Sequence, residues 1–235
     1  MNNQAGFPVF FTEASAALGR YDSNQAEAEA IAALGHFPLQ SSILDVGCGI
    51  GRMSKALHDL DMRVVGIDLS AEQIALAQWL NPGPTYLVAD AAAPPGGPYA
   101  GVVSIYSSFG YCDTPEQDAT WLAAWAARLK SGGRLIMELS DLERARHRLG
   151  TATFPLLRQN GNVEEQLTMD WDQSILSVVY RRGDCAFECK TRLYTQDQLV
   201  DLLETRGFDI LGCHGGFDGR SKPPNDRLVI FARRH

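Results

Sequence analysis

The fold is decided by one stretch of sequence, Ile43-Leu44-Asp45-Val46-Gly47-Cys48-Gly49-Ile50-Gly51. A short apolar run leads into three glycines at alternate positions, and a helix-type pattern begins directly afterwards, at Arg52. Glycine accepts positive φ and lets a ligand approach the backbone closely, while the start of a helix favours an anionic group. The stretch therefore predicts a strand, a ligand-binding turn and a helix in direct succession.

Further apolar runs of strand length follow this motif. They lie at 63–68, 85–90, 101–106, 133–139, 208–213 and 227–232. Helix-type patterns separate the early runs at 52–60, 71–80 and 116–129. Apolar strands without alternation, separated by helices, predict a parallel sheet that is covered on both faces. We expect an α/β fold, a doubly wound Rossmann-like sheet of about seven strands with the last one antiparallel.

The hydrophobic period changes to two between Val163 and Leu193. Turn residues interrupt this region at 172–174 and 183–184. Strict alternation between such turns predicts a three-stranded antiparallel meander. We expect residues 1–140 and 194–235 to form the core domain, and residues 141–193 to form an inserted antiparallel β lid.

Composition limits the classes of partner. Of the 235 residues, 45% are hydrophobic and 21% charged, which is typical of a globular protein, and the net charge of −7 disfavours nucleic acid and anionic lipid. Five cysteines without a C-x-x-C pair indicate reduced thiols, and the histidines lack metal-ligand spacing, so we expect no metal site. No signal-peptide pattern and no apolar run of membrane-spanning length occur, so we expect a cytoplasmic protein with no membrane contact. The sequence leaves the oligomeric state open.

Three acidic residues mark the ends of the first three apolar runs. Asp68 follows Gly47 by 21 residues, the spacing at which a carboxylate takes two ribose hydroxyls. Asp90 ends the next run, where a carboxylate can reach an adenine amino group. Asp45 precedes the first glycine by two residues, a position that suits an amino group. Together the three predict a nucleoside site.

Two classes of adenosine-containing cofactor could occupy such a nucleoside site. The dinucleotide pattern G-x-G-x-x-G places its third glycine three residues after the second, whereas Gly51 follows Gly49 by two. This spacing and Asp45 favour S-adenosylmethionine, whose methionine part carries an ammonium group. An NAD(P)-dependent oxidoreductase and a non-catalytic S-adenosylmethionine-binding protein remain the alternatives.

With these motifs the chain resembles the class I S-adenosylmethionine-dependent methyltransferases. Residues 45–51, 66–70, 89–91 and 129–135 are similar to four motifs of that family. The likeness extends from about Tyr21 to Arg234 and includes segments typical of small bacterial methyltransferases that carry an antiparallel lid and act on small molecules. Two positions depart from the family pattern, because Tyr99-Ala100 replaces Phe-Asp and Ser131 replaces a proline.

The resemblance implies a set of cofactor-binding residues. It comprises Tyr21, Asp45, Gly47, Cys48, Gly49, Arg52, Asp68, Leu69, Gln73, Asp90, Ala91 and Tyr106. By the same resemblance the glycines pass beneath the methionine part, while Tyr21 and Arg52 approach its carboxylate. Leu69 and Gln73 flank the adenine.

Methyl transfer from a sulfonium needs little acid–base chemistry, because holding the reacting atoms in line in a dry site supplies much of the rate. Four aromatic residues are candidates for lining such a site, and ordinary core packing is the alternative for each: Tyr21, Phe109, Tyr111 and Phe217. Phe109, Tyr111 and Phe217 are the candidates for binding the acceptor, and Tyr21 and Tyr111 those for a catalytic role. We expect the enzyme to methylate oxygen or nitrogen of a small molecule.

Overall fold

The computed structural model describes residues 24–235. Its elements are α2 (Asn24–Gly35), β1 (Ser42–Val46), α3 (Arg52–Asp59), β2 (Arg63–Asp68), α4 (Ala71–Leu80), β3 (Thr85–Val88), β4 (Tyr99–Ser104), α5 (Pro115–Arg128), β5 (Leu129–Leu139), α6 (Leu142–Leu149), β6 (Leu156–Asn160), β7 (Val163–Asp170), β8 (Ile175–Arg182), β9 (Cys185–Arg192), α7 (Gln196–Glu204), β10 (Phe208–His214) and β11 (Leu228–Arg234). No helix within residues 24–235 is long and apolar enough to cross a membrane.

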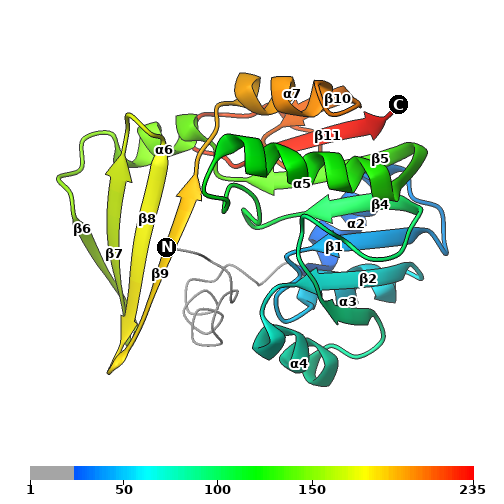
Figure 1. Ribbon diagram of the computed structural model, residues 1–235, viewed down its shortest axis with the longest axis horizontal. Helices are drawn as coiled ribbons and strands as arrows, with labels where there is room; N and C mark the ends of the chain where they lie inside the picture. The colour runs from blue at the N-terminus through cyan, green and yellow to red at the C-terminus, as the bar shows by residue number, and fades with distance from the viewer. Residues whose placement is uncertain (1–23) are drawn as a thin grey trace.

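The main sheet has seven strands in the order β10-β11-β5-β4-β1-β2-β3. β11 pairs antiparallel with both of its neighbours, and the other six strands run parallel to one another. The predicted doubly wound Rossmann-like α/β fold, with its last strand antiparallel, is confirmed. Because β1, β2 and β4 are parallel neighbours, their carboxyl ends meet at one edge of the sheet (Figure 1).

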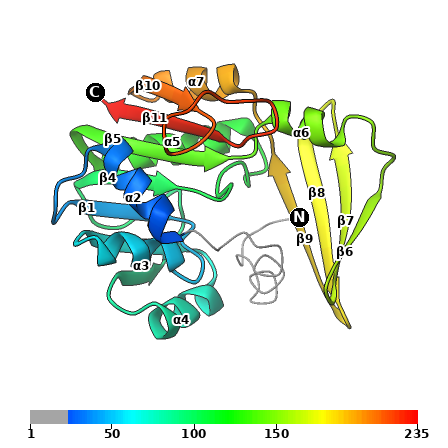
Figure 2. The same ribbon diagram turned by 180° about the vertical axis from the view of Figure 1, so that it is seen from behind.

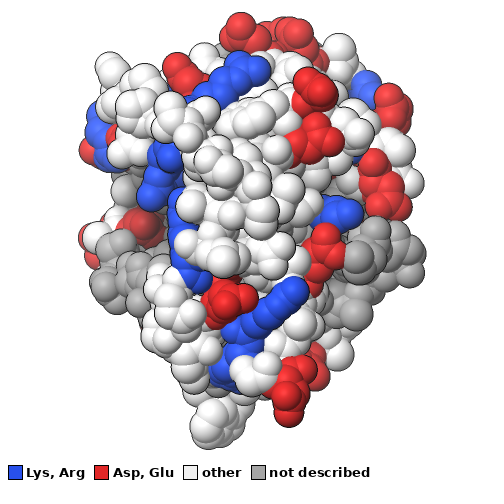
Figure 3. Space-filling view, turned by 90° about the vertical axis from the view of Figure 1, so that its left-hand side faces the viewer, with Lys and Arg blue, Asp and Glu red and all other residues white. Residues whose placement is uncertain are grey.

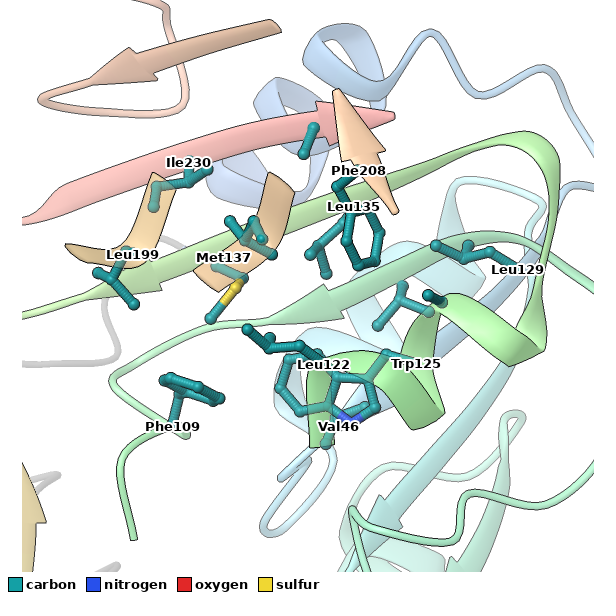
Figure 4. Packing of buried hydrophobic residues seen from close by; sticks show 14 of the residues in the cluster. Val46, Phe109, Leu122, Trp125, Leu129, Leu135, Met137, Leu199, Phe208 and Ile230 are labelled. Carbon is teal, nitrogen blue, oxygen red and sulfur yellow. The ribbon is translucent and has the colours of Figure 1, made fainter. Parts of the chain in front are cut away.

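Helices cover both faces of this sheet (Figures 1 and 2). Val102 and Val103 are neighbours in β4, so their side chains point to opposite faces. Val102 packs in a cluster that contains side chains of α5 and α7, whereas Val103 packs in a cluster with side chains of α2 and α3. Figure 4 shows the first cluster, in which Trp125 of α5 is completely buried.

A separate sheet of four antiparallel strands follows, in the order β6-β7-β8-β9. The prediction contained only the last three strands. β6 was missed because most of its residues are exposed and it lies at the edge, where no alternating burial is required. Figure 1 shows that the small sheet stands opposite the carboxyl ends of the parallel strands.

The transition into β5 also differs from the prediction. The sequence pattern predicted a helix over 116–129 and a strand that starts only at Gly133, but α5 ends at Arg128 and β5 begins at once. Leu129 pairs with Tyr99 of β4, so the glycines lie within a strand that is irregular at this point. Cross-strand pairing thus determines the boundary more strongly than the glycines do.

Candidate cofactor and acceptor site

The glycine turn after β1 requires residues without side chains. Gly47, Gly49 and Gly51 have φ values of +73°, +54° and +79°. A Cβ at Gly47 would lie 2.6 Å from Ser108, whereas among the described residues the atom nearest to a Cβ at Gly49 is Gln73 Oε1, at 3.8 Å. Residues 24–235 therefore leave room beside Gly49 for a ligand to approach the backbone.

Asp68 lies directly against this turn. Its Oδ2 accepts a hydrogen bond from the Gly49 amide at 2.9 Å, and its Oδ1 accepts one from the Ser70 amide at 2.9 Å. The contact follows from the parallel register, in which Val46 faces Ile67. Burial raises the pKa of the Asp68 carboxyl above its usual value. The structure thus brings Asp68 next to the glycine turn, as their spacing in the sequence predicted.

Asp45 sits beneath the turn and is 2% exposed. The Ser54 hydroxyl donates a hydrogen bond of 2.5 Å to its Oδ2. Burial, followed by the nearby charge of Asp68, raises the pKa of Asp45 to about 6. Burial also raises the pKa of the Cys48 thiol, so this cysteine is protonated and unreactive at neutral pH.

The residues predicted around the adenine lie near the ends of β2 and β3. Gln73 is buried, Leu69 is 38% exposed, and Asp90 is exposed with its Oδ1 accepting from the Ala92 amide at 2.8 Å. The carbonyl of Ala91 accepts a 2.9 Å hydrogen bond from the indole of Trp125, which ties the segment after β3 to the main core.

The turn after β4 is strained and strongly held. Tyr106 and Ser107 have φ values of +57° and +64°, a backbone region that L residues rarely adopt. The Glu138 Oε2 atom accepts from the Tyr106 amide at 2.7 Å and from Arg227 Nη1 at 2.9 Å. Ser107 Oγ in turn accepts from Arg227 Nη1 at 3.1 Å and from the Ser140 amide at 2.9 Å. This network fixes the turn at the carboxyl edge of the sheet.

Sequence reasoning missed Glu138 and Arg227 as site residues. Burial raises the pKa of Glu138, and the Arg227 charge acts in the opposite direction. A lone acid within the apolar run of β5 is the signal that could have indicated it, since a buried acid needs a partner. Its partner lies 89 residues away in sequence.

Tyr106 and Arg52 approach each other beside the glycine turn. The Tyr106 hydroxyl donates to Asn24 at 3.0 Å and to Glu27, and burial raises the pKa of its phenol. Arg52 is the first residue of α3, and its positive charge is near enough to act on the Tyr106 phenol. Tyr21, which was predicted to act beside Arg52, lies outside the described residues.

The aromatic candidates for the acceptor site have three different environments. Phe109 is 2% exposed, and its ring lies 5.9 Å from those of Trp125 and Tyr194, so its surroundings match core packing, the alternative role. Tyr111 instead packs against the apolar cluster of the small sheet, and Phe217 packs beside the cluster that contains α2 and α3. Burial raises the pKa of Tyr111 well above its usual value, so the phenol is protonated at neutral pH.

A cleft of about 150 Å³ opens between the loop after β4 and the small sheet. It is lined by Gly110, Tyr111, Cys112, Asp113, Ile175, Lys190 and Arg192. Tyr111 is the one predicted acceptor residue that borders it. No group of three His, Cys, Asp or Glu residues able to hold a metal ion occurs within residues 24–235.

These residues fit an adenosine-containing cofactor. The open glycine turn lets a ligand lie close to its backbone, and the Asp68 carboxylate at its rim can accept hydrogen bonds from ribose hydroxyls. The buried Asp45 offers a negative charge that suits an ammonium group nearby.

The chain is similar to known methyltransferases. A family model described as a methyltransferase domain matches residues 43–133. The chain is 33% identical over 124 residues to the dTDP-3-amino-3,4,6-trideoxy-alpha-D-glucopyranose N,N-dimethyltransferase of Streptomyces venezuelae, an alignment that covers 52% of each chain and so about half of that relative. It is 26% identical over 219 residues to a cypemycin N-terminal methyltransferase from Streptomyces sp, which covers 85% of this chain and 86% of the relative.

Solved structures share the whole fold. A S-adenosylmethionine-dependent methyltransferase from Clostridium acetobutylicum superposes with a TM-score of 0.80 at 15% identity, covering 96% of this chain and 98% of that one. CalS10, an amino pentose methyltransferase from Micromonospora echinaspora with S-adenosylmethionine bound, gives 0.69 at 18% identity, covering 97% and 98%. At such identities the superpositions show the fold alone. Residues 43–133 match a methyltransferase domain, and over most of its length the chain is similar to known methyltransferases.

Proposed function

We propose that this protein transfers a methyl group from S-adenosylmethionine to a nitrogen atom of a small-molecule or peptide amine. The observation that carries the proposal is the contact of Asp68 with the glycine turn at Gly49, at a sheet edge that the small antiparallel sheet faces. The names of the two curated relatives support nitrogen as the acceptor atom, since one acts on an amino sugar and the other on a peptide N-terminus.

Different site residues would bind different parts of the cofactor. Gly47 and Gly49 leave room beneath the methionine part, and Asp68 accepts the ribose hydroxyls. In the chain, Asp45 precedes the turn and Arg52 follows it, one acidic and one basic, as a zwitterionic amino acid group requires. Leu69, Gln73, Asp90 and Ala91 surround the adenine. We infer these roles from position, and each is open to substitution.

Bound S-adenosylmethionine supplies an electrophilic methyl group on a sulfonium, which a neutral amine can attack in line. The chain then has to orient the amine and exclude water. The turn at Tyr106-Ser107, held by Glu138 and Arg227, provides a rigid wall at the sheet edge. Tyr111, from the loop after β4, packs against the apolar cluster of the small sheet.

A small acceptor agrees with the shape of the site. The small sheet stands across the strand ends, where ligands bind in open α/β sheets (Figure 1). Charges of both signs are mixed on the outer side of the small sheet (Figure 3), whereas binding of a nucleic acid requires a surface of one sign. We therefore propose a small amine as the acceptor and the cytoplasm as the place of reaction.

Cofactor binding is tested by calorimetry of the purified protein with S-adenosylhomocysteine and, separately, with NAD. We expect binding of the first and none of the second. The reverse result would restore the oxidoreductase alternative.

The acceptor is tested with methyl-labelled S-adenosylmethionine and matched pairs of compounds. The amines are the dTDP-3-amino sugar of the Streptomyces venezuelae relative and a short peptide with a free N-terminus, and their controls are the hydroxyl analogue and the N-acetylated peptide. We expect label to enter at least one amine and neither control. Transfer to the hydroxyl analogue alone would place the acceptor atom at oxygen, and no transfer in a protein that binds the cofactor would favour the non-catalytic alternative.

A further inference from the structure

One face of the small sheet turns toward the core. Val163 and Leu167 of β7, Val178 of β8 and Cys189 of β9 share this face by strand alternation and pairing, and they form one apolar cluster. Tyr111, which comes from the core loop after β4, packs against the cluster. The contact defines this side as the inner face of the small sheet.

Glu165 lies on the inner face. It is two residues from both Val163 and Leu167 on β7, so its side chain points to the same side as theirs. Its Cα partner on β8 is Tyr180, another member of the apolar cluster. The structure thus places a carboxylate in the middle of the surface that faces the carboxyl ends of the parallel strands.

This carboxylate is buried and incompletely satisfied. Glu165 is 4% exposed, and within the described part of the chain its buried Oε1 has no hydrogen-bond partner. Arg158 is its Cα partner on β6, yet the two make no ion pair among residues 24–235. A buried carboxylate oxygen that lacks a hydrogen-bond donor is unfavourable, so such atoms are rare unless a ligand uses them.

We propose that Glu165 binds the amino group of the acceptor. The inference rests on the proposed function, because it names the residue that recognises the amine at that site. A carboxylate accepts hydrogen bonds only, which matches N–H donors and excludes phosphate and carboxylate groups. An amine that enters between the small sheet and the strand ends supplies the donor that Oε1 lacks in the described structure.

The position of Glu165 also suits the charge change of the reaction. As the nitrogen lone pair forms the new N–C bond and the C–S bond breaks, the positive charge passes from sulfur to nitrogen. The N–H proton stays on the product, hydrogen-bonded to the carboxylate. A fixed negative charge beside that nitrogen stabilises the transition state more than the neutral amine.

The test compares Glu165→Gln with Glu164→Gln. Both substitutions remove one negative charge from β7, but Glu164 is on the opposite face of the sheet, with Arg181 as its Cα partner on β8. We expect E165Q to raise the KM for the amine acceptor identified above at least tenfold, and E164Q to leave it within twofold. Both variants should keep the S-adenosylhomocysteine affinity of the unmodified protein, because neither residue lies at the glycine turn.

Thermal unfolding separates a binding role from a structural one. Because the described residues offer Oε1 no hydrogen-bond donor, E165Q should unfold at a temperature equal to or above that of the unmodified protein, whereas loss of a structural ion pair with Arg158 would lower it. An unchanged KM in E165Q, or a clear drop in its unfolding temperature, overturns the role of Glu165 while amine methylation stands. If the unmodified protein methylates no amine of the panel, the proposed function fails first and this inference with it.

Discussion

Substitution of Asp45 by asparagine should stabilise the protein at neutral pH. The Asp45 carboxyl is 2% exposed, and its pKa is raised from 3.8 to about 6, mainly by burial. The folded state therefore holds the Asp45 proton more tightly than the unfolded state does. At pH 7.5 both states are ionised, and the folded state bears the whole cost of the buried charge, about 3 kcal/mol for a shift of this size.

The sign of the pH dependence follows from the same shift. As the pH falls from 6 toward 3.8, the folded state takes up the proton first, so the cost declines and reaches about half its value near pH 5. The asparagine side chain does not ionise, so the variant has no such cost at any pH. The difference in unfolding free energy between Asp45→Asn and the unmodified protein should thus be largest at pH 7.5 and shrink at pH 5.

Urea denaturation at the two pH values measures this difference. Asp59→Asn is the matched control, because Asp59 forms a surface ion pair with Lys55 and should change stability by less than about 1 kcal/mol. Calorimetry with S-adenosylhomocysteine provides the second readout, and the Asp45→Asn variant should bind it more weakly since the negative charge near the ammonium group is gone. A variant that is less stable than the unmodified protein at pH 7.5, or a difference that grows on acidification, would refute the reasoning.

Three further substitutions test the site and its support. Asp68→Ala should weaken S-adenosylhomocysteine binding about thirtyfold or more in calorimetry, because charge-assisted hydrogen bonds in a partly buried site are worth about 2–4 kcal/mol, and circular dichroism should show an intact fold. Asp118→Ala should lower the unfolding free energy in urea by about 2–4 kcal/mol, since Tyr194 donates a 2.7 Å hydrogen bond to this fully buried acid, whereas the exposed Asp113→Ala should have little effect. Trp125→Ala should lower the unfolding free energy by about 3–5 kcal/mol in the same assay, because Trp125 is completely buried. Trp79→Ala should leave it almost unchanged, because the Trp79 side chain is 76% exposed. Equal losses in the two variants would contradict the assigned core.

Elements with strong local signals could be predicted from the sequence. α4 spans Ala71–Leu80 as expected, and the Ser70 hydroxyl accepts from the Gln73 amide at its start. α7 begins after Thr195 with a complete capping box. In both helices the residues that fix the boundary lie within one turn of it, so no tertiary information is required.

Features that depend on distant partners could not be predicted. β6 has no alternating burial and exists through its pairing with β7. Phe109 is an aromatic residue near the site in sequence, but its ring packs among Trp121, Trp125 and Tyr194, which come from two other segments of the chain. By contrast, the contact of Gly49 with Asp68 was predictable, because adjacent parallel strands end at the same edge.

Buried acids gather on both sides of the space between the two sheets, and together they favour a cationic or hydrogen-bond-donating ligand. On the core side, burial raises the pKa of both Asp45 and Asp68, whose hydrogen-bond donors in the described structure are hydroxyl and amide groups without charge. Glu138 differs because Arg227 neutralises it, which suits a residue that holds the backbone in place. On the opposite side stands Glu165, with an oxygen that the described residues leave unpartnered. Buried acids without a charged partner are unfavourable until a ligand compensates them. A sulfonium cofactor would supply positive charge on the core side, and an amine acceptor would supply N–H donors to Glu165.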